Sequence, residues 1–76
     1  MSNAFTAIQQ ALAVNTKKYR LEKGLSQEAL ALEAGIDRTY ASQIERGIAN
    51  PSLKVLCQVA EVLGVPLEKL TEYDLG

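Results

Sequence analysis

Five polar side chains recur within one short segment at spacings that place them on one side of a helix. They are Arg38, Thr39, Ser42, Gln43 and Arg46. At 100° per residue they fill an arc of about 140°, and Ala41 and Ile44 fall on the opposite side. Arginine can pair with both acceptors of guanine and glutamine with adenine, while threonine can donate a hydrogen bond or touch the methyl group of thymine. The pattern therefore favours a helix that reads base pairs in the major groove of DNA.

A solvated helix face is the alternative interpretation of these five side chains. Such a face usually carries Glu and Lys four residues apart, and this one lacks them. A further candidate is Gln27, which follows Ser26 at the start of the preceding predicted helix. Free N–H groups at a helix N-terminus bind phosphate, and the glutamine amide can add a donor. Otherwise Gln27 is simply a solvated residue of the first turn.

The composition excludes most catalytic and metal chemistry. The 76 residues include no His and a single cysteine, Cys57. Without His the usual general base and the Ser–His and Cys–His pairs are missing, and one Cys cannot build a zinc site. No apolar run approaches the ~18 residues of a membrane span. We expect one domain over residues 1–76 that is not an enzyme, binds no cofactor, metal or evident small molecule, and works in the cytoplasm.

Charge is distributed unevenly along the chain, although the net charge is only −1. Residues 1–54 carry seven basic and five acidic side chains, which gives +2, and residues 55–76 carry one basic and four acidic ones, which gives −3. A weakly basic front and an acidic rear suit a protein that presents one face to a polyanion. The alternative is that these charges are scattered over the solvated surface without a binding role, which would give the same numbers of basic and acidic side chains.

Glycine and proline divide the chain into five short segments, each of which predicts a helix. The expected helices cover residues 5–23, 26–34, 37–46, 52–63 and 66–72. Ser26, Asp37 and Ser52 are expected N-caps. The second and third helices are joined by about three residues with Gly35 at the corner, which is the helix-turn-helix connection. The chain is therefore expected to be all-α.

The fourth helix carries more apolar surface than one small core needs. With Leu53 set at 0° on the core side, its apolar residues span about 220°, from +40° round to −180°, whereas a helix packed on one core needs little more than 100°. Cys57 falls on the same core side. The excess predicts a two-fold dimer interface built from Val55, Val59, Val62, Leu67, Leu70 and Tyr73. Alternatively, the first and fifth helices cover all of the apolar surface of the fourth helix, and no dimer interface is needed.

Three runs, residues 20–31, 35–47 and 50–53 (RLEKGLSQEALA, GIDRTYASQIERG and NPSL), resemble the phage-repressor, or Cro/repressor-like, helix-turn-helix family, also called the xenobiotic-response-element family. The resemblance covers about residues 14–72. The stretch Asp37-Arg38-Thr39-Tyr40 is also similar to the controller proteins of restriction–modification systems. The resemblance implies a five-helix domain in which the second and third helices form the DNA-reading unit.

The resemblance also implies roles for individual residues. It places base contacts at Arg38, Thr39 and Gln43, with Ser42 as a further reader, and phosphate contacts at Gln27, Tyr40 and Arg46. It pairs Arg20 with Glu45 in an ion pair that clamps the first helix to the third.

Three departures from the family pattern bear on function. Ile48 and Ala49 follow Gly47 where a basic residue is common, Ala41 replaces a larger aliphatic, and Leu21 and Leu32 occupy positions that are usually polar.

The sequence predicts a transcriptional regulator that binds a palindromic stretch of double-stranded DNA as a homodimer. Half-sites one helical turn apart, about 34 Å, would match the two-fold symmetry of such a dimer. A helical protein-interaction module, or an antitoxin-like partner with weak or no DNA binding, is the alternative. The acidic balance and the missing basic residue after Gly47 favour this second hypothesis.

Overall fold

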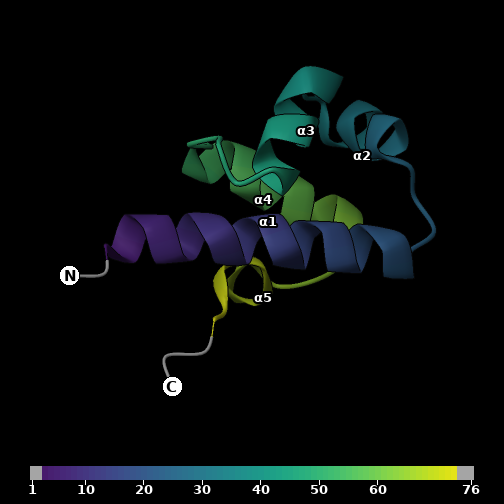
Figure 1. Cartoon of the computed structure of the whole chain (residues 1–76). Coiled ribbons are helices and arrows are strands. Elements are labelled where there is room, and N and C mark those ends of the chain that lie inside the picture. The colour runs from purple at the N-terminus through teal and green to yellow at the C-terminus, as the bar shows by residue number, and fades with distance from the viewer. Residues whose placement is uncertain (1–2, 74–76) are drawn as a thin grey trace.

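The computed structural model describes residues 3–73, and this part of the chain is all-α (Figure 1). It forms five helices: α1 Ala4–Glu22, α2 Gln27–Ala34, α3 Arg38–Glu45, α4 Leu53–Leu63 and α5 Leu67–Thr71. The long α1 runs across the molecule, with α2 and α3 on one side of it and α5 on the other. Contacts link α1 to α3 and α5, and α2 to α3 and α4. The predicted fold class is confirmed, and the helices begin and end close to their expected bounds.

Local hydrogen bonds explain where three of the helices begin. The Ser26 hydroxyl accepts from the Ala29 N–H at 3.0 Å, the Asp37 carboxylate from the Thr39 N–H at 2.9 Å, and the Ser52 hydroxyl from the Val55 N–H at 3.2 Å. All three predicted N-caps are confirmed, and each contributes about 1 kcal/mol. Gly35 ends α2 at φ 70°, a left-handed conformation that costs a residue with a Cβ more. That turn sets α3 across α2.

The core lies where the five helices meet. Leu30 of α2, Ile44 of α3, Val59 of α4 and Leu70 of α5 are all fully or almost fully buried, and Leu12 of α1 joins them. Ala41 and Ile44 are buried on the inner side of α3, as its periodicity predicts. The outer side of α3 is thereby left to its polar residues.

The expected orientation of α4 is wrong. Val59 and Leu70 are completely buried within one chain, so neither can supply surface to a dimer. Leu53, which was expected to face the core, is 67% exposed, and Cys57 is exposed as well. An almost wholly apolar helix can bury either side, and α2 and α5 pack on the side of Val59.

The other predicted interface residues keep part of their surface. Val55, Val62 and Leu67 are half-buried against the core, and Tyr73 is exposed. None of the described helices combines the length and the hydrophobicity needed to cross a membrane.

Side-chain amides of α1 hold two distant segments. The Gln9 amide donates to the Ala49 carbonyl at 2.6 Å. The Asn15 amide donates to the carbonyls of Leu70 at 3.0 Å and Glu72 at 2.8 Å. These bonds fix the loop after α3 and the end of α5 against α1. Local sequence patterns did not predict them.

Candidate nucleic-acid interface

The five polar side chains of the sequence pattern lie on the outer side of α3. Arg38, Thr39 and Arg46 are exposed, while Ser42 and Gln43 are half-buried. Because Ala41 and Ile44 hold the inner side in the core, α3 cannot rotate without exposing them. The polar side is therefore presented in one fixed orientation.

A polar hollow of about 260 Å³ lies between this side of α3 and the start of α2. Its lining consists of Gln27, Arg38, Thr39, Ser42 and Arg46. The structure thus brings four of the five α3 residues together with Gln27, whereas Gln43 lies outside the hollow. Two arginines and the unpaired N–H groups of the first turn of α2 give this region the chemistry of an anion site.

A buried ion pair holds α1 to α3 behind the hollow. Arg20 Nε donates to Glu45 Oε2 at 2.6 Å and Nη2 donates to Oε1 at 2.9 Å, while Nη1 donates to the Leu25 carbonyl at 2.8 Å. The two side chains are only 10% and 4% exposed. The hydrogen bond to Glu45 raises the pKa of Arg20 above its ordinary value, although burial acts in the opposite direction. Both charges are therefore satisfied inside the protein.

Glu45 also contacts Gln27 of α2, the residue predicted to contact a DNA phosphate. The Gln27 amide donates one N–H to Glu45 Oε1 at 3.3 Å. Since an amide nitrogen carries two hydrogens, the second remains for a group in the hollow. One carboxylate thus connects Arg20 of α1, Gln27 of α2 and its own helix α3. Neither the spacing nor the family resemblance predicted the contact between Gln27 and Glu45.

The remaining candidates lie at the margins of the interface. Tyr40 is half-buried and packs against the core. Beyond Arg46 and Gly47 at the end of α3, Ile48 is exposed, whereas Ala49 is buried. This part of the loop therefore presents an aliphatic side chain and no positive charge.

Comparison with known proteins places this arrangement in a family. The sequence profile described as helix-turn-helix matches residues 17–70. A hypothetical transcription factor of Neisseria meningitidis is 41% identical, over 83% of this chain and 59% of its own length. SinR of Bacillus subtilis is likewise matched over 59% of its length, so the chain spans about three fifths of these two relatives.

Two solved structures have the same fold. The N-terminal DNA-binding domain of SinR from Bacillus subtilis has a TM-score of 0.80 and 37% identity, over 88% of this chain and 99% of that one. The restriction–modification controller protein C.AhdI from Aeromonas hydrophila has a TM-score of 0.78 and 35% identity, over 82% and 94%. The fold, the α2–α3 unit and the matched profile together show that this chain belongs to the helix-turn-helix family.

Proposed function

We propose that this chain binds double-stranded DNA at specific sequences and regulates transcription, with α3 in the major groove. The polar outer side of α3, held in one orientation by Ala41 and Ile44, carries this proposal. The names of the similar proteins, a transcription factor, SinR and controller proteins, support it. We propose that this binding takes place in the cytoplasm.

In this proposal the exposed side chains divide into two groups. Arg38, Thr39, Ser42 and Gln43 contact base edges, whereas Gln27, Tyr40 and Arg46 contact phosphates. Glu45 takes no part in base reading, because both of its oxygens are engaged by Arg20 and Gln27.

The protein is further proposed to act as a homodimer on an imperfect palindrome. Two copies related by a two-fold axis place their α3 helices about 34 Å apart, one turn of DNA. The contact uses Leu53 and Cys57, which are exposed on α4, and Tyr73, which is exposed after α5. Val55, Val62 and Leu67 of the predicted interface are half-buried against the core and can add only part of their surface. Sedimentation tests this surface, because Leu53→Asp should yield monomers and Leu32→Asp, on α2, should not. If sedimentation gives Leu53→Asp the same oligomeric state as the natural chain, this surface is not the dimer contact.

Selection of bound duplexes from a random DNA pool tests the binding proposal most directly. The expected result is a palindrome with half-sites about 10 bp apart. Arg38→Ala should then lower affinity by about 1–3 kcal/mol and relax the preference at one base pair. Lys69→Ala, which lies on α5 beside Glu72, serves as the matched control. An equal loss by Arg38→Ala on every sequence contradicts base reading.

A helical protein-interaction module is the second candidate function. The exposed Ile48 after α3 favours it, because this position offers no charge to a phosphate. Salt separates the two functions, since phosphate contacts alone give measurable binding to random duplexes at about 50 mM salt. Absence of binding under those conditions favours the interaction module.

A further inference from the structure

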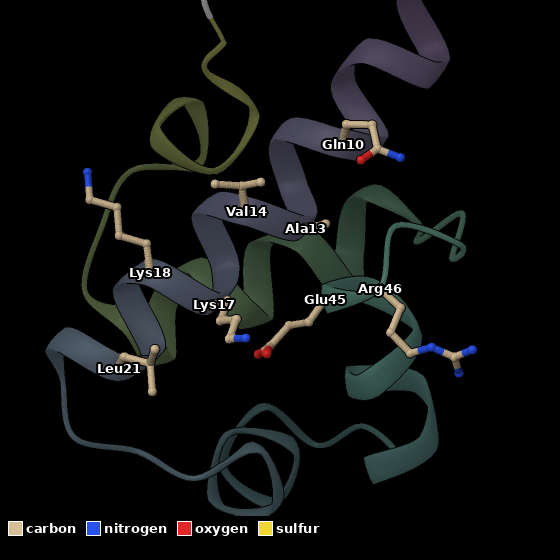
Figure 2. A pocket seen from close by; sticks show the side chains of 8 residues that line it. All are labelled: Gln10, Ala13, Val14, Lys17, Lys18, Leu21, Glu45 and Arg46. Carbon is tan, nitrogen blue, oxygen red and sulfur yellow. The ribbon is translucent and has the colours of Figure 1, made fainter.

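An open groove of about 390 Å³ lies between α1 and the end of α3, next to the proposed DNA-binding surface (Figure 2). Its α1 side carries Val14, Lys17, Lys18 and Leu21, and α3 contributes Glu45 and Arg46. Figure 2 shows Lys17 directed toward the Glu45 carboxylate, with Lys18 and Val14 on the other flank of α1. The groove is therefore bordered by elements already held rigidly by the Arg20–Glu45 ion pair.

Two aliphatic side chains in this groove face solvent. Val14 is 65% exposed and Leu21 is 58% exposed. They lie seven residues apart, two helical turns or about 10 Å along α1, and so share one face. Leu21 also stands where the sequence pattern of the family favours a polar residue. The stability of the domain does not require either side chain, because neither belongs to the buried core.

Apart from the Glu45 carboxylate, the charged side chains that line the groove are positive. Lys17 and Lys18 lie between Val14 and Leu21, and Arg46 borders the groove from α3. The negative charge of Glu45 does not balance them, because it is buried and bonded to Arg20. An occupant must therefore be both apolar and acidic.

This combination distinguishes among the possible occupants. A second copy placed symmetrically on the groove would bring like charges together, which costs free energy. A phosphate backbone would satisfy the lysines but would leave Val14 and Leu21 against hydrated, charged groups. An amphipathic helix with carboxylates beside its apolar stripe satisfies both kinds of side chain.

We propose that the groove binds an acidic amphipathic helix of a partner protein. Aliphatic residues of that helix cover Val14 and Leu21, and its carboxylates pair with Lys17 and Arg46. Arg46 also lines the DNA-facing hollow, so the helix and DNA compete for one guanidinium. The docking stands independently of the proposed function, whereas the competition rests on it.

Selection from a display library of peptides of about 15 residues tests the docking, since a helix of that length spans the groove. The whole chain is the bait. The selected peptides should combine Asp or Glu with aliphatic residues at helical spacing. Their affinity should fall roughly tenfold or more for Leu21→Glu, because a leucine that the peptide covers is replaced by a charge that repels the carboxylates of the peptide. Leu32→Glu, at a still more exposed leucine on α2, should leave the affinity unchanged.

Several results would overturn the docking proposal. One is a selection whose peptides bind Leu21→Glu and Lys17→Glu as well as they bind the natural chain. Another is a set of DNA titrations in which Lys17→Ala lowers the salt slope by about one while no selected peptide depends on Leu21; the groove then belongs to the DNA interface.

A third measurement separates docking from competition. The best selected peptide should displace a DNA duplex from the natural chain, and Leu21→Glu should resist that displacement. If the peptide binds but does not displace the DNA duplex, the proposed competition is wrong and the docking proposal stands. Absence of DNA binding by the natural chain refutes the proposed function while leaving the docking intact.

Discussion

Replacement of Glu45 by alanine tests the buried ion pair, because the change leaves the Arg20 guanidinium with one hydrogen bond, to the Leu25 carbonyl. Removal of one partner of a buried pair costs about 3–5 kcal/mol. A domain of this length has a total stability of about 4–11 kcal/mol. Glu45→Ala should therefore remove a large part of the stability and lower the melting temperature by more than about 10 °C.

Urea and thermal unfolding followed by circular dichroism measure this loss. Glu72→Ala is the matched control, because Glu72 pairs with Lys69 at 3.6 Å with both side chains largely exposed; its loss should stay under about 1 kcal/mol. The double variant Arg20→Met, Glu45→Leu should recover much of the stability, since no charge is then left buried. A cost for Glu45→Ala as small as that of Glu72→Ala would refute the reasoning.

The pH dependence of this contribution follows from the pKa of Arg20. The hydrogen bond to Glu45 raises that pKa in the folded state. A group with a raised folded-state pKa stabilises fully below its unfolded pKa and loses the contribution as pH rises through the folded value. The arginine contribution should therefore stay constant across the neutral range and disappear only in strong alkali.

Three further changes have distinct expected outcomes. Thr16→Val should leave stability unchanged or raise it by up to about 1 kcal/mol in urea unfolding, because the buried Thr16 hydroxyl has no hydrogen-bond partner in the described structure; a clear loss would reveal a partner. Val59→Asp should unfold the chain, as seen by circular dichroism, because it places a charge in the core; a folded monomer would contradict the observed burial. Gln27→Ala should weaken DNA binding equally on all duplexes, and a changed sequence preference would argue against a phosphate contact.

Features that depend on nearby residues could be predicted from the sequence. The caps at Ser26, Asp37 and Ser52 each use a hydrogen bond to a residue two or three positions away, so a short pattern contains all the information. The inner side of α3 was also predictable, because only two of its residues, Ala41 and Ile44, are small or aliphatic enough to be buried there.

Features set by distant packing could not be predicted in this way. The apolar arc of α4 allows two orientations, and only the positions of α2 and α5 select the one that buries Val59 and exposes Leu53. The bonds from Asn15 to the end of α5 join residues more than 50 positions apart. In the candidate interface, the outward position of the polar side of α3 was predictable, but the contact of Gln27 with Glu45 requires the folded angle between α2 and α3.

That contact has a consequence for how such a domain acquires new targets. Arg20 and Glu45 form a buried pair that also bonds Gln27 in the lining of the hollow, whereas Arg38 and Thr39 are exposed in that lining. Replacement of Arg38 and Thr39 therefore leaves the fold and the contacts among Arg20, Glu45 and Gln27 intact. A lineage can then reach new operator sequences through few mutations without first rebuilding a stable protein.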